Sequence, residues 1–309
     1  MDLFQDIYLK RLSKFIKKNQ ISIIILAKNS YPGIKKAIRS IEIQEYPSLE
    51  IIIQCNPTCK KTVNYIKTLA SKKFIIKKIF SKDKNVGDAW NKSLKHVSGD
   101  IVGSLDTDNM LQKNILYKIN RHFVKNKNDQ IIYGNVVLKS KNKTFKFIPD
   151  DYNAEKLKRI ELVPPFSATF FNLKKLKKEN LKCTNLNLAD FSIWLKNQKK
   201  IIKKVNYTVC TNSWTKLSST FNYKTYNKYV KARLDILNYY EKKSSKLQIY
   251  RSNCYFWAAS SLNSFHDELV ASNKERSDIN RLIKKFINKS LQYYSKNKKT
   301  IELKRKINL

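Results

Sequence analysis

The feature that most constrains this chain is an alternation of apolar strands and amphipathic helices between residues 21 and 105. Residues 21–27 form a nearly continuous β-branched run, which is typical of a parallel strand covered on both faces. Further strands are predicted over 49–53, 74–79 and 101–105, and the segments between them have helical periodicity. Three strand–helix units in this order predict a right-handed, doubly wound α/β sheet.

An acidic cluster, Asp106-Thr107-Asp108-Asn109, follows the fourth of these strands directly. Ligands of open α/β sheets bind beyond the carboxyl ends of the strands, so this cluster lies where a ligand is expected. Two carboxylates at positions i and i+2 can share a hard divalent cation with phosphate oxygens of a substrate. The alternative is a polar turn that caps a helix beginning near Gln112. The two acids alone leave both interpretations open.

The remaining pattern divides the chain into three parts. Residues 1–20 are predicted to form a basic amphipathic helix, whose apolar stripe could pack on the body of the protein or lie in an anionic membrane interface. Strands over 130–138, 144–147 and 201–210, and a helix that begins near Leu188, extend the α/β domain over 21–217. Residues 218–309 are predicted to be a helical C-terminal region, with a basic tail over 296–309 that frays.

The net charge is unusual, since 63 Lys and Arg residues against 24 Asp and Glu residues give +39. Such a field attracts nucleic acid, anionic membrane surfaces or phosphorylated substrates. A chain this rich in Lys, Asn and Ile, with only 5 Gly and 6 Pro, could also owe part of its charge to compositional drift on solvated faces. No nucleic-acid-binding motif is present, so we expect no specific nucleic-acid partner.

The five cysteines are scattered and lack the spacing of a zinc site, which favours a reducing compartment. No apolar run approaches the roughly 18 residues that a membrane-spanning helix needs. Asp2 and Asp6 stand where a signal peptide would have its basic start and apolar core. We therefore expect a cytoplasmic protein, soluble or peripheral at the inner face of the plasma membrane.

Several motifs now coincide in order and spacing, over roughly residues 20–215. The chain resembles the family 2 glycosyltransferases with the GT-A fold, and the segment 83–109 is the most specific part of the resemblance. The motifs that carry it are Glu50-Ile51-Ile52-Ile53, Asn85-Val86-Gly87-Asp88-Ala89-Trp90-Asn91-Lys92, Ser98-Gly99-Asp100, Leu105-Asp106-Thr107-Asp108-Asn109, Tyr133-Gly134-Asn135, Pro164-Pro165-Phe166-Ser167 and Ala189-Asp190.

The resemblance implies transfer of a sugar, with inversion, from a nucleotide-sugar donor to a glycan or lipid-linked acceptor. A UDP-sugar is the expected donor, and synthesis of a cell-surface polysaccharide or lipopolysaccharide is the expected setting. By position, Asp106 and Asp108 would bind Mn²⁺ or Mg²⁺, and Asp106 would also approach the ribose of the donor. The metal would neutralise charge on the departing diphosphate.

The resemblance also implies a base for the acceptor hydroxyl, and by position that base is Asp190. Asp190 could equally be a first-turn carboxylate stabilised by the helix dipole. Lys92 could assist the diphosphate or belong to a solvated face. The polar residues of the 85–91 motif either contact the donor or only cap and brace the helix start; they are Asn85, Asp88 and Asn91.

One position departs from the family pattern. Family members commonly carry an Asp pair after the second strand, where this chain has Gln54-Cys55-Asn56. Asn56 could still hydrogen-bond the edge of a base, or Asp83 could substitute for the missing acid. The departure leaves two other hypotheses open, a non-catalytic GT-A-like scaffold and, on charge alone, a basic nucleic-acid-binding protein.

Overall fold

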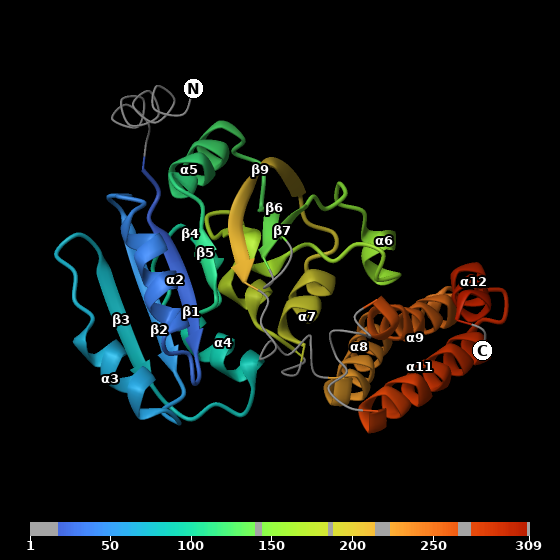
Figure 1. Cartoon of the computed structure of the whole chain (residues 1–309). Helices are drawn as coiled ribbons and strands as arrows, with labels where there is room; N and C mark the ends of the chain where they lie inside the picture. The colour runs from blue at the N-terminus through green and yellow to red at the C-terminus, as the bar shows by residue number, and fades with distance from the viewer. Residues whose placement is uncertain (1–17, 140–143, 185–187, 214–222, 265–272, 308–309) are drawn as a thin grey trace. The chain divides into compact units, whose positions relative to one another are not determined.

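The structure is a computed structural model that describes residues 18–139, 144–184, 188–213, 223–264 and 273–307 (Figure 1). Contacts divide the chain into two compact units. The first holds the described parts of Met1–Tyr152, Pro164–Leu186 and Lys199–Trp214, and the second holds those of Asn153–Val163, Asn187–Gln198 and Thr215–Leu309. The helix predicted over residues 1–20 lies almost wholly outside the described residues.

Four parallel strands form one half of the first unit's sheet, in the order β3-β2-β1-β4. They are β1 (Ile21–Ala27), β2 (Leu49–Cys55), β3 (Ile75–Phe80) and β4 (Ile101–Ser104). The helices α2 (Gly33–Glu42), α3 (Lys60–Thr68) and α4 (Val86–Leu94) connect them. This arrangement confirms the predicted doubly wound α/β fold, and it brings the carboxyl ends of all four strands to one edge.

The other half of the sheet is mixed, and the full order is β3-β2-β1-β4-β8-β6-β9-β5 with β7 paired to β6. Its strands are β5 (Asn109–Leu111), β6 (Ile131–Lys139), β7 (Thr144–Phe147), β8 (Thr169–Asn172) and β9 (Ile202–Ser213), and α5 (Ile115–Lys125) lies between β5 and β6 in the chain. Short 3-10 segments occur at Phe166–Ala168 and Lys178–Leu181.

The last residue of the acidic cluster and the two residues after it form strand β5 and not a helix cap. Asn109, Met110 and Leu111 pair antiparallel with Asn212, Thr211 and Cys210 of β9. Helix α5 begins only at Ile115, three residues after the position expected for the helix start. Because β9 extends to Ser213, it offers a free strand edge that satisfies the backbone groups of residues 109–111. The cluster is therefore held between two strands, β4 and β5.

The core explains why the isoleucine-rich runs become central strands. Every residue of β2 is buried, and all but one of β1. One face of α2 packs on this sheet through side chains that are at most 1% exposed, namely Ile34, Ala37, Ile38 and Ile41. Burial of one such aliphatic side chain contributes about 1.5–3 kcal/mol, so these strands form a rigid support for the loops at their carboxyl ends.

At the opposite edge, Glu50 fixes the start of β4. Its side chain is fully buried and accepts hydrogen bonds from Ser98 N at 2.6 Å, Gly99 N at 3.1 Å and the hydroxyl of Ser22. Lys77 Nζ lies 2.7 Å from Glu50 Oε2. A Cβ at Gly99 would lie 2.8 Å from Gln20 O, so this close approach requires glycine. The carboxylate thereby ties together the strands that deliver the acidic cluster.

We expect Glu50 to make the free energy of unfolding depend on pH in the acidic range. Burial raises the pKa of this carboxyl, but hydrogen bonds from Lys77, Ser22 and Ser98 outweigh it and lower the pKa to about 2. A lowered pKa gives stabilisation that is complete above the ordinary value of 4.5 and is lost as the pH falls toward 2. The shift corresponds to about 3 kcal/mol.

Urea unfolding between pH 7 and pH 2.5 measures this effect. The Glu50→Gln variant should be less stable than the wild type at pH 7, and the difference should shrink as the pH approaches 2. Glu302→Gln, at an exposed position of the C-terminal helices, is the matched control and should follow the wild type. Parallel pH curves for wild type and Glu50→Gln would contradict the assignment.

The second unit consists of helices. They are α6 (Ala154–Lys158), α7 (Ala189–Lys196), α8 (Tyr226–Glu241), α9 (Leu247–Ser264), α11 (Asn273–Tyr293) and α12 (Lys298–Lys306), with a 3-10 segment at Tyr223–Thr225. The predicted fraying of the basic tail is wrong for residues 298–306, because Asn297 caps α12 by accepting a hydrogen bond from Thr300 N. No helix in the described ranges is long and apolar enough to cross a membrane.

Two segments from the middle of the chain, 153–163 and 187–198, belong to this helical unit. Polar contacts join the first of them to the C-terminal helices. Tyr250 Oη donates to Glu155 Oε2 at 3.0 Å, and Lys158 Nζ lies 3.2 Å from Glu241 Oε2. Residues separated by more than 80 positions in the chain therefore share one packed unit.

Candidate active site

The acidic cluster lies in a tight turn at the carboxyl end of β4. Leu105 N donates to Ile24 O at 3.0 Å, which keeps the chain attached to β1 up to the first acid. Asn109 N then donates to Asp106 O at 3.0 Å, and Asn109 Nδ2 lies 3.3 Å from Asp106 Oδ2. Asp108 O accepts a hydrogen bond from Ser213 N at the end of β9. The backbone on both sides of the two acids is therefore fixed.

Helix α2 begins directly beside this turn. A Cβ on Gly33, the first residue of α2, would lie 2.8 Å from Thr107 O. The absence of a side chain at residue 33 therefore lets the helix start approach the backbone between Asp106 and Asp108. Helix N-termini carry exposed N–H groups and favour anions, which suits this edge of the sheet to a phosphate-bearing ligand.

The side chains of Asp106 and Asp108 are both solvent-accessible. Partial desolvation by the surrounding chain nevertheless raises the pKa of Asp108. A carboxylate in such surroundings gains from a cation that restores the lost solvation. In the described part of the chain, no group of three or more His, Cys, Asp or Glu side chains could hold a metal. A cation here would therefore have two carboxylates as its protein ligands, with water or substrate oxygens completing its shell.

A second polar group follows β2, where the family's acid pair is missing. Gln54 Nε2 donates to Ser81 Oγ at 2.7 Å and to Asp83 Oδ1 at 3.1 Å, and Asn56 Nδ2 lies 3.4 Å from Asp83 O. The amide oxygens of both side chains, Gln54 Oε1 and Asn56 Oδ1, are buried without a hydrogen-bond partner. An unsatisfied buried acceptor is costly, so these two oxygens are suited to a ligand that carries N–H groups.

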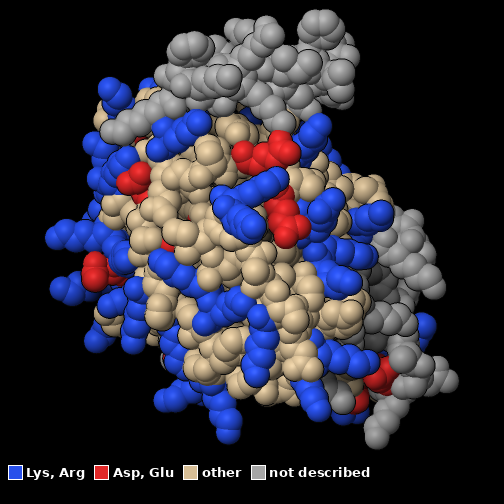
Figure 2. Space-filling view, turned by 90° about the vertical axis from the view of Figure 1, so that its left-hand side faces the viewer, with Lys and Arg blue, Asp and Glu red and all other residues tan. Residues whose placement is uncertain are grey.

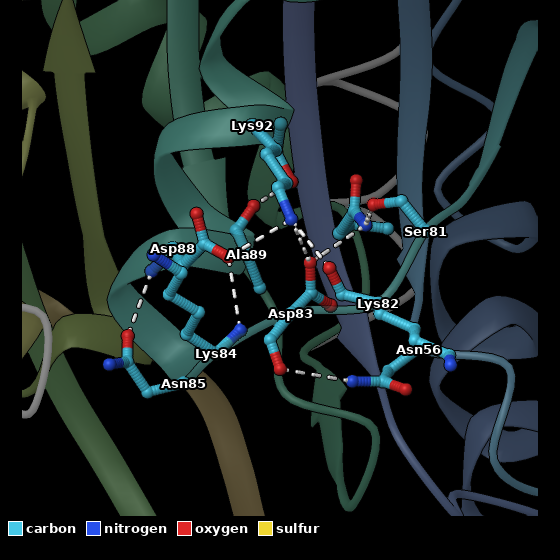
Figure 3. Close-up of polar contacts among 11 residues, drawn as sticks. Asn56, Ser81, Lys82, Asp83, Lys84, Asn85, Asp88, Ala89 and Lys92 are labelled. Atoms are coloured by element: carbon cyan, nitrogen blue, oxygen red, sulfur yellow. Dashed lines mark hydrogen bonds and ion pairs between the residues drawn. The ribbon is translucent and has the colours of Figure 1, made fainter.

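Lys92 joins two of the predicted donor-binding acids (Figure 3). Its Nζ lies 2.9 Å from Asp88 Oδ2, 3.2 Å from Asp83 Oδ1 and 2.6 Å from Lys82 O. The hydrogen bonds that Lys92 donates to Asp88 and Asp83 raise its pKa, and hydrogen bonds from Lys84 N and Lys92 lower the pKa of Asp88. An ammonium group has three donors, and all three are used here. In this geometry Lys92 fixes the loop between β3 and α4.

The polar residues at the start of α4 have local partners. Asn85 is the N-cap of α4, and its side chain accepts a hydrogen bond from Asp88 N at 3.0 Å. Asp88 Oδ2 in turn accepts from Lys84 N at 3.0 Å. One turn further on, the amide of Asn91 pairs with the backbone of Cys183, accepting from its N–H at 2.9 Å and donating to its carbonyl at 3.2 Å. These contacts match the capping and bracing alternative, and a role in donor binding stays a prediction.

Asp190, the predicted base, lies in the second unit, in the first turn of α7. Its Oδ1 accepts a hydrogen bond from Phe191 N at 2.8 Å. Its charge acts on Arg233 of α8 in the same unit. Burial lowers the pKa of Arg233, and the negative charge of Asp190 is among the influences that act in the opposite direction.

The sequence analysis did not single out Arg233. Its guanidinium carbon lies 3.5 Å from the ring centroid of Trp257, and the buried Nε and Nη1 atoms have no hydrogen-bond partner. Stacking on the aromatic face compensates part of the desolvation of this cation. One arginine in a helix rich in lysine and tyrosine gives no sequence signal, because its burial depends on Trp257 of another helix.

Comparison with known proteins decides the family. The model of glycosyl transferase family 2 matches residues 22–192, which include β1 to β4 and the acidic cluster. The chain belongs to glycosyl transferase family 2. As a member of this family it is a glycosyltransferase, and the resemblance inferred from the motifs is confirmed. No curated protein sequence matches the chain.

Solved structures are similar in fold. The crystal structure of S. aureus TarS 1-349 has a TM-score of 0.54 and 14% identity, covering 94% of this chain and 92% of that one. The structure of its complex with UDP-GlcNAc has a TM-score of 0.53 and 13% identity, again covering 94% of this chain and 92% of that one. The structure of a mannosyltransferase from Pyrobaculum calidifontis, in complex with GDP-Man and Mn²⁺, has a TM-score of 0.53 and 12% identity, covering 94% of this chain and 95% of that one. At these identities the similarity concerns the fold, which is GT-A.

Proposed function

We propose that this glycosyltransferase moves a sugar, with inversion, from a nucleotide-sugar donor to a glycan or lipid-linked acceptor, in the synthesis of a cell-surface polysaccharide or lipopolysaccharide. The observation that carries the proposal is the pair of accessible carboxylates, Asp106 and Asp108, fixed at the carboxyl edge of a GT-A sheet. This edge is where α/β sheets bind nucleotides. The family and the two similar structures with bound sugar nucleotides support the donor class.

We infer that Asp106 and Asp108 hold Mn²⁺ or Mg²⁺. Carboxylate oxygens are the ligands that these hard cations prefer, and a bound cation would offset the partial desolvation that raises the pKa of Asp108. When bound, the metal would neutralise negative charge on the departing diphosphate. The chain itself contributes the fixed turn, which holds the two carboxylates in place before the donor arrives.

The donor base is proposed to lie against Gln54 and Asn56. Their amide oxygens have no hydrogen-bond partner and could each accept one, and a uracil ring offers an N–H donor on its pairing edge. Asp83 is already engaged by Lys92 and Gln54, so it supports this subsite through its neighbours. A UDP-sugar is therefore the proposed donor.

Asn56→Leu is expected to weaken UDP binding about 5- to 20-fold, which corresponds to one hydrogen bond in a buried site. Leucine has a similar shape but provides no acceptor for the base. Calorimetric titration of UDP in the presence of Mn²⁺ measures the loss. Asn64→Leu, at an exposed position of α3, is the matched control and should leave the affinity unchanged. Equal UDP affinity in Asn56→Leu and wild type would contradict this assignment of the subsite.

One titration experiment tests the proposed function as a whole. UDP, GDP, CDP and their sugar derivatives are titrated into the protein with and without Mn²⁺. Saturable, metal-dependent binding of one of them supports the proposal, whereas no binding across the panel would favour a non-catalytic scaffold. A DNA titration at rising salt addresses the remaining alternative, since incidental binding to a basic surface disappears near physiological salt.

The charge of the surface supports an anionic acceptor or membrane. Figure 2 shows lysine and arginine side chains spread over the face beside β3, with few acidic ones between them. The exposed basic residues of the chain include several on α2 and α3, namely Lys35, Lys36, Arg39, Lys60, Lys61 and Lys67. Such a face attracts a polyanionic glycan, a lipid-linked diphosphate or anionic lipids. We accordingly propose a peripheral position at the inner face of the plasma membrane.

A further inference from the structure

A small cavity within the second unit includes none of the proposed nucleotide or metal ligands in its lining. Its volume is about 110 Å³, and it is lined by residues that follow α6, by the middle of α9 and by the start of α12. A single water needs about 10–15 Å³ of such space, so the cavity accommodates a polar group larger than one water. The lining residues are Arg159, Ile160, Glu161, Asn253, Phe256, Trp257, Ser260, Ser261 and Lys299.

The guanidinium of Arg159 is the feature of this cavity that requires a partner. Its Nε is buried without a hydrogen-bond partner, and no ion pair involves this side chain among the described residues. The side chain as a whole is half-buried, so the cost concerns this one N–H donor, which is enclosed without an acceptor. The planar fork of a guanidinium matches a carboxylate or phosphate group, with two parallel N–H···O bonds.

The other polar groups of the cavity also favour an oxyanion. Glu161 Oε1 lies 2.8 Å from Lys299 Nζ, so the one carboxylate that lines the cavity is paired with Lys299. Asn253 is 8% exposed, and its Oδ1 accepts from Asn297, which leaves its Nδ2 as a donor. Serine hydroxyls within helices often bond to the preceding turn, as Ser93 does to Ala89 O. Ser260 and Ser261 make no hydrogen bond of this kind within the described chain.

The backbone at the rim of the cavity is held in an unusual conformation. Ile160 has φ of +58°, in the left-handed region that β-branched residues rarely adopt. It ends α6 in the position where glycine is usual, with Glu161 N bonded to Lys156 O at 2.9 Å. Both neighbours of Ile160 in the chain, Arg159 and Glu161, line the cavity. Strain of this kind is frequent at ligand sites.

We propose that this cavity binds the phosphate or carboxylate group of a small molecule, with Arg159 as the main ligand and Ser260, Ser261 and Asn253 as further donors. The cavity holds the phosphate or carboxylate group of the ligand. Phe256 and Trp257 are the aromatic residues of its lining. This site is independent of the nucleotide site, because every residue that lines it belongs to the second unit.

Calorimetric titration of the full chain at fixed ionic strength tests the proposal. The probes are inorganic phosphate, glycerol 3-phosphate and glucuronate, which distinguish a free ion, a phosphate ester and a sugar carboxylate as the source of the oxyanion. We expect saturable binding of at least one probe with one site per chain. Arg159→Gln should weaken it by about 10-fold or more, and Arg159→Lys should restore only part of the affinity because lysine lacks the fork.

Two controls make the outcome decisive. Arg281→Gln removes a cation whose side chain is 80% exposed in the same unit, and it should bind the probe like the wild type. Asp108→Asn should also retain this binding, which separates the site from the nucleotide site. Arg159→Gln should fold with an unchanged or higher unfolding temperature, because it removes a buried Nε–H donor that has no hydrogen-bond partner. No saturable binding of any probe, or equal binding by Arg159→Gln and wild type, would overturn the proposal.

Discussion

Replacing Asp108 with alanine is expected to lower kcat/KM for Mn²⁺-dependent sugar transfer by about a thousandfold, which corresponds to about 4 kcal/mol of transition-state stabilisation. Asp106 and Asp108 are the two accessible carboxylates of the turn after β4, and no larger cluster of ligating side chains occurs among the described residues. Loss of one carboxylate leaves a single acid to hold a divalent cation. Activity is measured as release of the nucleoside diphosphate, and Mn²⁺ affinity by titration in the presence of UDP.

Asp108→Asn and Asp151→Asn sharpen this test. Asp108→Asn keeps the size of the side chain and removes its charge, so it should resemble Asp108→Ala in activity. Asp151, whose side chain is 94% exposed in the same unit, is the matched control and should tolerate the change. The raised pKa of Asp108 means that the fold disfavours its ionised form, so neither Asp108 variant should be less stable than the wild type. Activity within tenfold of the wild type would exclude Asp108 as a metal ligand.

The half of the fold that supports the acids could be predicted from the sequence because its signals are local. The run from Ile21 to Ala27 and the apolar residues of α2 report burial through their spacing alone. Parallel strands place their carboxyl ends at one edge, so the location of Asp106 and Asp108 followed from strand order. The absence of the family's Asp pair at Asn56 could also be recognised from the sequence, because finding that position requires only the end of β2.

Other features depend on residues that are distant in sequence. β5 exists because β9, about 100 residues later, offers its edge to Asn109–Leu111. Lys92 is engaged because the β3–α4 loop folds back and brings Asp83 to its Nζ. The cavity at Arg159 is formed by residues that follow α6 together with residues of α9 and α12. No periodicity or spacing within one segment encodes such contacts, so they require the structure.

Replacing Asp190 with asparagine is expected to lower kcat by about 10²–10⁴, the usual contribution of a positioned general base. The change separates the two interpretations of this residue. As a base, the carboxylate takes the proton of the acceptor hydroxyl, which an amide cannot do. As a helix-start residue, it only accepts the hydrogen bond from Phe191 N at 2.8 Å, and the amide oxygen of asparagine accepts the same bond. A purely structural role therefore predicts little change in kcat.

The measurement compares kcat with donor affinity. Asp190→Asn should bind UDP with Mn²⁺ as tightly as the wild type, because the proposed nucleotide ligands all lie in the other unit. Asp235→Asn, at an exposed position of α8, controls for loss of one negative charge and should keep full activity. Unfolding of Asp190→Asn reports the loss of the charge that partly compensates the buried Arg233. An unchanged kcat would assign Asp190 to the helix start and require another residue as the base.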